Sequence, residues 1–328
     1  MGTTQTSSRP SIDDVLTPAH RAELTGFCYR MLGSAFDAED AVQETFTRAW
    51  RAYDRFEGRS EVRTWLYRIA SNVCFDTLRG RQRRALPMEM TGSTPASDGL
   101  IGVPLPESAF VEPAPGNSVS TRPSDPAEAA AERESIRLAF VAALQYLPPQ
   151  QRAVLILRDV LKWHASEVAE LLDTTVAGVN SALQRAHATM NARQRAEVPT
   201  VEPDDEAQGE LLARYVDAFE RYDIEALTAL IAADATQSMP PWAMWLQGRD
   251  EILAWWQGIG AGCRGSRLIV TEANGSVALG QYNIEPAGGH APWALQMVRW
   301  GPDGIAEFTF YLDAARLFPL FGLPAHLD

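Results

Sequence analysis

The chain is poor in lysine and cysteine, and it has no long hydrophobic run. Lys162 is the single lysine beside 28 arginines. Cys28, Cys74 and Cys263 are widely spaced and form no CxxC pair, so the sequence predicts no disulfide framework and no metal site. No segment approaches the roughly 18 apolar residues of a membrane-spanning helix, and the N-terminus lacks the apolar core of a secretory signal. These absences predict a soluble, cytoplasmic protein.

Negative charge is in excess but unevenly distributed. The net charge is −13 over 328 residues, a length that suits two or three domains. Residues 21–84 carry 12 arginines against 9 acidic side chains, whereas residues 201–328 carry 7 basic against 18 acidic side chains. An acidic C-terminal part repels DNA, which favours a regulatory role there, although solubility alone would also explain it.

Breaks in composition divide the chain. Residues 85–126 contain eight prolines without sustained periodicity, and residues 198–206 combine two prolines with an acidic run. Both are predicted to be linkers. The predicted organisation is a flexible N-terminus (1–20), a first module (21–84), a linker (85–126), a second module (127–197), a linker (198–206) and a third module (207–328).

Two packed helices are predicted at the start of the first module. Apolar residues follow a helical spacing over 24–32 and again over 42–53, with an inward face of Val42, Phe46, Ala49, Trp50 and Tyr53. Asp37 is the predicted N-cap of the second helix. Asp40, Gln43, Glu44 and Thr47 are left on the opposite face, available to a partner or simply solvated.

The third predicted helix runs from Glu61 to Arg81 and ends in an arginine cluster. Such a cluster neutralises phosphates, although basic residues at a helix C-terminus also suit the helix dipole. Asn72 and Asp76, one turn apart, can hydrogen-bond to base edges. The loop before this helix is suited to holding a base taken out of the stack.

The second module has the pattern of a helix-turn-helix over residues 164–190, HASEVAELLDTTVAGVNSALQRAHATM. Thr175 is the predicted N-cap of the second helix, and Val179, Leu183 and Ala186 anchor it inward. Gly178 costs about 1 kcal/mol of helix propensity, and it either permits close approach to DNA or is simply tolerated.

These two modules resemble regions two and four of the extracytoplasmic-function group of bacterial sigma factors. The resemblance implies that core RNA polymerase is bound by Asp40, Gln43 and Glu44. It implies that the minus-ten promoter element is read by Ser60, Arg63, Asn72, Asp76 and Arg79. It implies that the minus-thirty-five element is read by Thr175, Ala177, Gly178, Asn180, Ser181, Gln184 and Arg185. Related proteins often carry a basic residue at the positions of Asn180 and Ala182, so weaker electrostatic binding to DNA is expected. They usually carry a Ser or Thr cap at the position of His164.

The third module reads as helices followed by strands. Two helices joined near Asp223 precede a third in GRDEILAWWQGI, and four strand patterns follow over 267–273, 276–284, 293–300 and 305–312. Turn signals between them predict a curved antiparallel sheet. The predicted fold class is therefore two all-α domains followed by an α+β domain. This module resembles the SnoaL-like, nuclear-transport-factor-like cone, which implies a domain that modulates the activity of the sigma factor.

Aromatic residues of this module are candidates for a ligand pocket, and they could equally form its core. The candidates are Trp242, Trp245, Trp256, Tyr282 and Trp293. A catalytic cone needs an acid or base aimed into the pocket, and the candidates Asp234, His290 and Asp313 are better explained as helix caps or loop residues. No catalytic residue, cofactor or metal is therefore predicted.

The sequence thus favours an alternative sigma factor that directs promoter-specific initiation by core RNA polymerase. Two alternatives stay open: a stand-alone helix-turn-helix regulator whose cone senses a small molecule, and a cyclase-like enzyme. A regulator of that kind would bind duplex DNA without polymerase, usually as a symmetric dimer.

Overall fold

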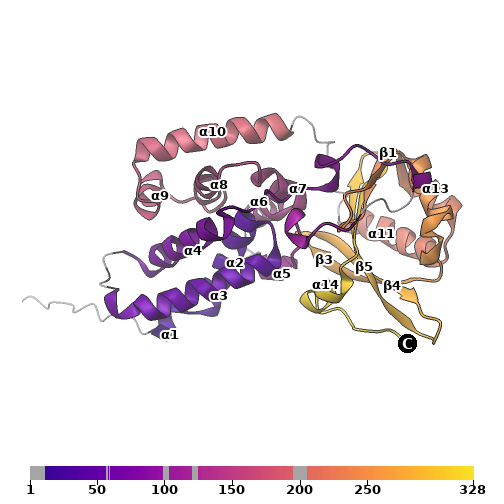
Figure 1. Ribbon diagram of the computed structural model, residues 1–328, viewed down its shortest axis with the longest axis horizontal. Coiled ribbons are helices and arrows are strands. Elements are labelled where there is room, and N and C mark those ends of the chain that lie inside the picture. The colour runs from indigo at the N-terminus through magenta and orange to yellow at the C-terminus, as the bar shows by residue number, and fades with distance from the viewer. Residues whose placement is uncertain (1–11, 57, 59, 99–102, 120–124, 195–204) are drawn as a thin grey trace, which may run out of the picture. The chain divides into compact units, whose positions relative to one another are not determined.

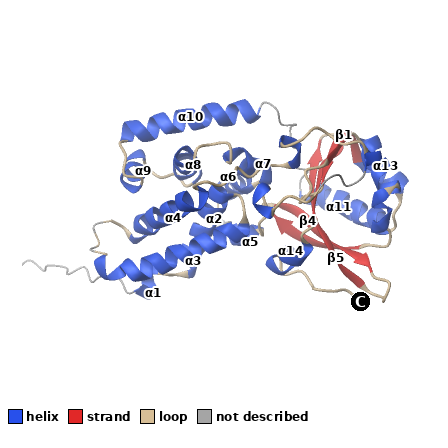
Figure 2. Cartoon of the chain, in the orientation of Figure 1, coloured by secondary structure: helices blue, strands red, loops and turns tan. Residues whose placement is uncertain are grey.

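The computed structural model describes residues 12–56, 58, 60–98, 103–119, 125–194 and 205–328. The chain divides into two compact units. The first combines the chain before Arg84 with Glu112–Arg195, and the second combines Arg84–Val111 with Ala196–Asp328. The first unit is helical, and the sheet belongs to the second (Figures 1 and 2). Each unit is therefore built from two separate stretches of chain.

The N-terminal part of the first unit consists of α1 (Ile12–Val15), α2 (Pro18–Leu32), α3 (Ala35–Ala52) and α4 (Val62–Leu78). The N-cap of α3 is Ser34, whose hydroxyl accepts a hydrogen bond from Asp37 N at 3.2 Å. The prediction that Asp37 caps this helix was therefore wrong. The hydroxyl of Ser34 accepts from the N–H of the third helical residue, as an N-cap does, and the carboxylate of Asp37 instead accepts from Arg81 at 2.8 Å.

Trp50 does not face inward as predicted. Its side chain is 66% exposed, whereas Val42 and Ala49 are fully buried. The buried stripe of α3 passes through Thr45, which is also fully buried. A helix turns about 100° per residue, so a narrow stripe at Val42, Thr45 and Ala49 leaves Trp50 outside it.

The remaining helices of the first unit are α5 (Gly116–Val119), α6 (Pro126–Ile136), α7 (Leu138–Leu144), α8 (Pro149–Leu155), α9 (Ala165–Leu171) and α10 (Val176–Gln194). Helices α6 and α8 both begin with proline at the first helical position, where the missing N–H is not needed. The carboxylate of Asp125 caps α6 by accepting from Ala127 N and Glu128 N. A π-helical turn, Ile156–Val160, continues α8.

Two buried arginines connect α2 to the helices that follow residue 126. Arg30 is 2% exposed and donates to Gly26 O at 2.8 Å and to Ser135 Oγ at 2.7 Å. Arg152 is 4% exposed and donates to Met31 O, to Gln145 Oε1 at 2.6 Å and to Gln145 O at 2.9 Å. Burial lowers the pKa of both guanidinium groups to about 10, so both carry a positive charge at neutral pH.

The second unit is a six-stranded sheet with four helices. Its helices are α11 (Asp205–Glu220), α12 (Ile224–Leu230), α13 (Arg249–Gln257) and α14 (Ala314–Leu320). Its strands are β1 (Ile231–Ser238), β2 (Trp245–Gln247), β3 (Arg267–Ala273), β4 (Ser276–Ile284), β5 (His290–Gly301) and β6 (Gly304–Tyr311).

The strand order is β2-β1-β6-β5-β4-β3. The four strands expected from the sequence form the antiparallel part, and β1 adds a parallel pairing with β6. The sheet is therefore mixed where an antiparallel one was expected. The sequence did not indicate β1, because it follows α12 without a turn and its first residues, IAADA, are alanine-rich.

The two faces of this sheet carry different layers. Tyr215 of α11, Trp256 of α13 and Phe308 of β6 form an aromatic cluster on one face, with ring centroids 5.5 to 5.9 Å apart for the pairs that include Phe308. On the other face, Tyr282 of β4 meets Phe318 of α14 at 5.0 Å. Side chains of successive strand residues point to opposite faces, which explains this division.

The Pro-rich segment Arg84–Val111 belongs to the second unit, and its described residues 84–98 and 103–111 are called the strap below. Thr94 N donates to Trp245 O at 2.7 Å, and Leu105 N donates to Pro241 O at 2.9 Å. Trp245 Nε1 donates to Thr91 O at 2.9 Å. Ala96 lies in the main apolar core of the unit. The strap is thus a docked part of the domain.

The two ends of the strap are joined to each other. Ala85 pairs with Phe110 in an isolated β-bridge, and both residues are 2% exposed. The guanidinium of Arg84 donates to Glu107 O at 2.7 Å and to Phe110 O at 2.6 Å. Tyr311 of β6 donates to Val111 O at 3.0 Å. The segment therefore forms a closed loop held at its neck.

The sequence predicted a free linker over 85–126, but in the structure the strap residues of this stretch are docked on the second unit. Proline removes backbone donors and favours extended chain, which prevents regular secondary structure but leaves carbonyl oxygens and apolar rings free to dock. The C-terminal part of the same stretch forms α5, which lies in the first unit. Within the described residues, no helix is long and apolar enough to cross a membrane.

Replacing Arg152 with methionine tests the buried arginine contacts. Methionine keeps an unbranched apolar stem but leaves the carbonyl oxygens of Gln145 and Leu147 without the donors that they have now. Each buried acceptor left unpaired costs about 1–3 kcal/mol. We expect Arg152→Met to lower the free energy of unfolding by about 3 kcal/mol in urea, followed by circular dichroism at helical wavelengths.

The matched control is Arg79→Met, because the Arg79 side chain is 80% exposed. Its free energy of unfolding should change by less than about 0.5 kcal/mol. A loss below about 1 kcal/mol for Arg152→Met would contradict a stabilising role for these contacts.

Candidate nucleic-acid and ligand sites

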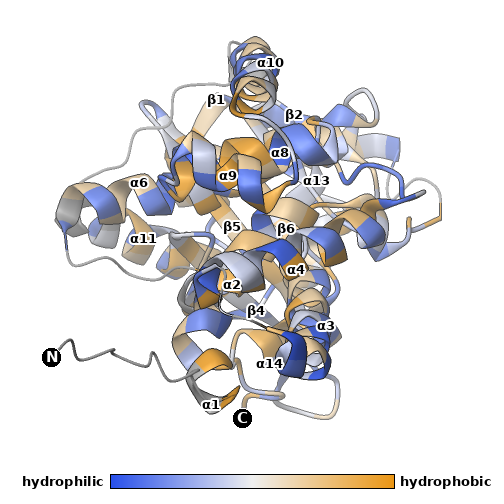
Figure 3. Cartoon of the chain, turned by 90° about the vertical axis from the view of Figure 1, so that its left-hand side faces the viewer, coloured by the Kyte–Doolittle hydropathy of each residue, from blue (hydrophilic) through white to orange (hydrophobic). Residues whose placement is uncertain are grey.

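An exposed stripe runs along α3. Asp40, Gln43 and Thr47 are exposed, and the exposed indole of Trp50 continues the same stripe one turn further. Figure 3 shows hydrophilic and hydrophobic segments along the ribbon of α3. Glu44, also expected to contact a partner, lies beside this stripe and accepts from Arg48 Nε at 2.7 Å. The stripe therefore offers carboxylate, amide and indole groups together, and Trp50 is the member that the sequence interpretation missed.

The candidate minus-ten residues on α4 fall into two groups. Asn72, Asp76 and Arg79 are exposed along the C-terminal half of the helix, and Asp76 accepts from Arg79 at 3.2 Å and from Arg48 at 3.3 Å. Arg63 lies at the other end, where it donates to Glu23 at 2.7 Å. Ser60 is half-buried just before the helix.

Arg63 is held in place by rings as well as by charge. Its guanidinium carbon lies 5.5 Å from the ring centroid of Tyr67 and 5.0 Å from that of Trp163. Burial is the largest single influence on the pKa of Arg63 and lowers it, but the hydrogen bonds and charge interactions with Glu23 and Tyr67 together raise this pKa above its ordinary value. In this conformation Arg63 has a structural role in addition to any role on DNA.

The arginine cluster after α4 is engaged within the protein. Arg81 pairs with Asp37, and the guanidinium of Arg83 stacks over Tyr146 at 3.5 Å. Arg84 is 8% exposed and holds the neck of the strap. Of the four arginines, Arg79 is the most suited to a phosphate contact in this conformation, with its side chain 80% exposed.

Helices α9 and α10 form the helix-turn-helix. Val168 and Val179 are fully buried between them, and Ala186 is buried further along α10. Thr175 Oγ1 accepts from Gly178 N at 3.0 Å, so Thr175 caps α10. The candidate contact residues Ala177, Asn180, Ser181, Gln184 and Arg185 are all exposed on α10.

Gly178 has a packing reason that the sequence interpretation lacked. A Cβ at this position would lie 2.8 Å from Thr174 Oγ1 and 3.3 Å from Thr175 Oγ1. Those distances are too short for a carbon atom beside a hydroxyl oxygen, so glycine leaves room for the turn itself. Close approach to DNA is not required to explain it.

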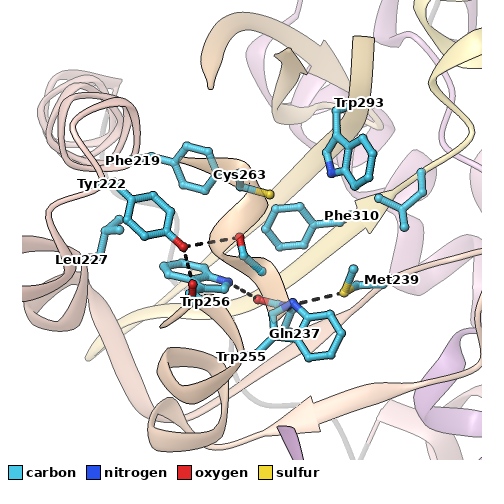
Figure 4. A pocket seen from close by; sticks show the side chains of 12 residues that line it. Phe219, Tyr222, Leu227, Gln237, Met239, Trp255, Trp256, Cys263, Trp293 and Phe310 are labelled. Atoms are coloured by element: carbon cyan, nitrogen blue, oxygen red, sulfur yellow. Dashed lines mark hydrogen bonds between the residues drawn. The ribbon is translucent and has the colours of Figure 1, made fainter. Parts of the chain in front are cut away.

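An apolar pocket opens in the second unit between α11, α13, β1, β5 and β6 (Figure 4). It is lined by Phe219, Tyr222, Leu227, Gln237, Met239, Trp255, Trp256, Gly260, Cys263, Trp293, Phe310 and Leu312. Its empty volume is about 420 Å³, including the open mouth. The rings of Phe219, Trp255, Trp256, Trp293 and Phe310 make the pocket a slot between flat side chains.

Polar groups in the pocket are few and neutral. Gln237 is 1% exposed, and its Oε1 accepts from Trp256 Nε1 at 2.8 Å (Figure 4). Burial raises the pKa of the Tyr222 hydroxyl and of the Cys263 thiol, which keeps both uncharged at neutral pH. The described lining contains no carboxylate, histidine, lysine or arginine.

Two of the five candidate pocket residues, Trp256 and Trp293, line this pocket, and the other three lie elsewhere. Trp242 packs against the core, and Trp245 holds the strap. Tyr282 lies on the α14 face of the sheet and donates to Pro324 O at 2.8 Å.

The acid and base candidates are outside the described lining of the pocket. Asp234 is exposed on β1, and the carboxylate of Asp313 at the start of α14 binds Arg316 at 2.8 Å. His290 is not an exposed loop residue as expected. It begins β5, is half-buried, and its Nε2 lies 3.1 Å from Gly265 O.

A buried polar chain beside the pocket was not expected from the sequence. Tyr215 donates to Gln296 Oε1, and Gln296 Nε2 donates to Gln281 Oε1, both at 2.8 Å. Gln281 Nε2 continues to Ser266 Oγ at 3.1 Å. The signal in the sequence was one glutamine in the middle of each of two largely apolar strands, Gln281 of β4 and Gln296 of β5. Each polar side-chain group in this series of hydrogen bonds has a partner, so the series stabilises the domain.

Comparison with known proteins matches three parts of the chain to family models. Residues 16–84 match sigma-70 region 2, residues 137–190 match sigma-70 region 4, and residues 212–311 match the SnoaL-like domain. The ECF RNA polymerase sigma factor SigG of Mycobacterium tuberculosis is 44% identical over 314 residues, covering 95% of this chain and 84% of SigG. This chain belongs to the extracytoplasmic-function (ECF) family of RNA polymerase sigma factors.

Two further ECF sigma factors are similar to this chain at lower sequence identity. SigW of Bacillus subtilis is 27% identical over 54% of this chain and 85% of its own length. The crystal structure of the ECF sigma factor SigJ of Mycobacterium tuberculosis covers 94% of this chain and 98% of SigJ, with a TM-score of 0.57 and 21% identity, which shows a shared fold.

As a sigma factor, the chain binds core RNA polymerase and promoter DNA. The sigma-factor interpretation is therefore supported over that of a stand-alone helix-turn-helix regulator. The expected fold, two helical sigma domains followed by a SnoaL-like α+β domain, is also confirmed.

Thr175 tests whether the start of α10 depends on its cap. Thr175→Ala removes the hydroxyl that accepts from Gly178 N, which typically costs about 1 kcal/mol. We expect a loss of that size in the free energy of unfolding, measured by denaturant titration, and near wild-type stability for Thr175→Ser. If Ala and Ser variants were equally stable, the cap would not matter.

Proposed function

We propose that this ECF sigma factor reads the minus-ten element with α4 and the minus-thirty-five element with α10, and that its C-terminal unit restrains it until polymerase binds. The observation that carries the first part is the exposed face of α10, where five candidate contact residues lie together beyond a capped helix start. Such a face suits the major groove. The chain would act with RNA polymerase in the cytoplasm.

The core-polymerase contact is proposed to be the α3 stripe of Asp40, Gln43, Thr47 and Trp50. An exposed indole such as that of Trp50 indicates a binding surface, because large aromatic side chains contribute much of the binding energy at protein interfaces. The neighbouring carboxylate of Asp40 supplies charge that steers a basic partner surface. Glu44 would contribute only after releasing Arg48.

The packing of the first unit supports the proposal that regions two and four are held together before polymerase binds. Arg68 of α4 donates to Glu170 O of α9 at 3.0 Å, so the two candidate DNA-reading regions contact each other. The minus-ten and minus-thirty-five elements lie about 25 base pairs apart, or about 85 Å at 3.4 Å per base pair. Regions two and four must separate to reach both.

The strap controls how far they can separate. Fully extended, the roughly 28 residues of Arg84–Val111 span up to about 90 Å. In the docked strap, Ala85 is paired with Phe110, so the segment adds almost no reach between the two regions. We propose that release of the strap from the C-terminal unit is required for promoter engagement, which makes that unit an inhibitor in cis.

Charge reversal at Asp40 tests the polymerase surface. Asp40→Arg places a positive charge on the α3 stripe, opposite to the sign that a basic partner surface would attract. We expect at least tenfold weaker binding to purified bacterial core polymerase, measured by fluorescence anisotropy of the labelled full-length chain. Asp54→Arg, an exposed reversal outside the stripe, should bind as wild type. Equal effects of the two reversals would reject the stripe.

Release of the strap is tested at Glu251. Its carboxylate accepts from Ala96 N at 2.7 Å, and Asp250 beside it is exposed in the same first turn of α13. Removing a partly exposed charged acceptor costs about 1 kcal/mol, or about fivefold in the docking equilibrium. We expect Glu251→Ala to increase run-off transcription with core polymerase several-fold, and Asp250→Ala to leave it unchanged.

The opposite result would be equally clear. If Glu251→Ala reduced transcription while core polymerase binding stayed normal, the strap would assist initiation and inhibition in cis would be rejected. If the full-length wild type failed to initiate on any promoter library, the promoter-reading proposal would itself fail.

A further inference from the structure

The pocket of the second unit and the docking site of the strap share a wall. Met239 and Leu312 line the pocket. Pro240 and Pro241 lie between these two pocket residues and the strap. The carbonyl of Pro240 accepts from Leu312 N at 2.9 Å, and the carbonyl of Pro241 accepts from Leu105 N of the strap at 2.9 Å. The pocket wall is thus connected to the strap through two consecutive backbone carbonyls.

The same core joins the pocket to the other half of the strap. Ala96 of the strap belongs to one apolar cluster with Met239, Trp255 and Trp256, which line the pocket. Glu251, which holds Ala96 N, lies on α13 one turn before Trp255. Helix α13 therefore carries a strap contact near its start and a pocket wall near its end.

The lining indicates the chemical class of the occupant. Flat rings from α11, α13, β5 and β6 surround a narrow slot, a shape that suits a planar ring system by stacking (Figure 4). No ionisable side chain that is charged at neutral pH is among the described lining residues, so a charged ligand would lose its hydration without compensation.

One polar group gives the occupant an orientation. The carboxamide oxygen of Gln237 accepts a hydrogen bond from Trp256 Nε1. The carboxamide nitrogen has two hydrogens, and among the described residues it donates to the thioether sulfur of Met239 at 3.7 Å. A thioether is a weak acceptor, so this nitrogen can donate to a better one. A carbonyl, ether or hydroxyl oxygen on the ligand would satisfy it.

We propose that the pocket binds a neutral, planar aromatic small molecule bearing one hydrogen-bond acceptor, and that this occupant tightens the docking of the strap. A ring between Met239 and the tryptophans fixes the Pro240–Pro241 wall in the position that Leu105 needs. Ligand then favours the strap-docked form, because it binds that form better. The second half of the proposal rests on the proposed restraint of the sigma factor; the ligand site does not.

The first test uses N-phenyl-1-naphthylamine, a neutral aromatic fluorophore, with the full-length chain. We expect saturable fluorescence enhancement that weakens at least fivefold in Trp293→Ala. Trp293 lines the pocket but is 45% exposed, so its removal should leave the fold intact. Ile284→Ala, a 59% exposed apolar residue of β4 outside the lining, is the matched control and should bind as wild type.

The coupling is tested by hydrogen exchange and by reciprocity. Saturating fluorophore should slow exchange in the peptide that contains Leu105, in the wild type but not in Trp293→Ala, because ligand raises the cost of local opening. A coupling between two sites acts equally in both directions. Glu251→Ala, which loosens the strap outside the pocket lining, should therefore weaken fluorophore binding to the extent that it lowers the docked fraction, whereas Asp250→Ala should not.

Each failure has a separate meaning. Absent saturable binding, or equal binding in Trp293→Ala and wild type, would overturn the ligand site. Binding that depends on Trp293 without any change in exchange at Leu105 would overturn the coupling and leave the ligand site standing. Neither result depends on transcription, so failure of the promoter-reading proposal would be seen separately in the run-off assay.

Discussion

The first unit depends on keeping the charge of Arg152 inside the protein. Its donors reach oxygen atoms of Met31, Gln145 and Leu147, which belong to separate stretches of chain. A buried guanidinium without acceptors is costly, so these stretches must stay in register or separate together. Separation returns the guanidinium and the carbonyl oxygens to water, which offsets much of the lost bonding. Regions two and four are therefore joined by a contact that is specific in geometry and whose loss on separation is partly offset by hydration.

The second unit adds a constraint of a different kind. The strap has little secondary structure of its own, and its described contacts with the rest of the unit include hydrogen bonds at Thr91, Thr94, Ala96, Leu105 and Val111, with Ala96 also in the apolar core. Each contact is modest, but they are linked by one chain, so loss of one lowers the effective concentration of the next. The strap can thus be stable when docked and still release as a whole when a tighter partner competes for the regions that it connects.

Local patterns predicted much of this architecture, and long-range packing explains what they missed. The strands Arg267–Ala273 and Ser276–Ile284 were expected with the observed limits because a tight Asn-Gly turn joins two alternating runs. The strand β1 escaped notice because its partner β6 lies some 70 residues later in the chain. Composition correctly indicated that the Pro-rich segment lacks regular structure, but composition carries no information on what an irregular segment contacts. The exposed face of α10 was predictable from helical spacing, whereas Trp50 and the pocket lining depend on which faces other elements cover.

The divided origin of the second unit has a consequence for synthesis on the ribosome. The strap ends at Val111, but its hydrogen-bond partners in the rest of the unit run from Pro241 to Tyr311 of β6. At about 5–20 residues per second, the roughly 120 residues between the end of region four and Tyr311 take roughly 6–24 s, during which both sigma regions are made and the strap still lacks its full set of partners. If the strap restrains the sigma regions as proposed, the nascent chain passes through a stage in which that restraint is absent. A chain that stopped after region four would remain in that stage, because it would lack the strap's partners up to Tyr311.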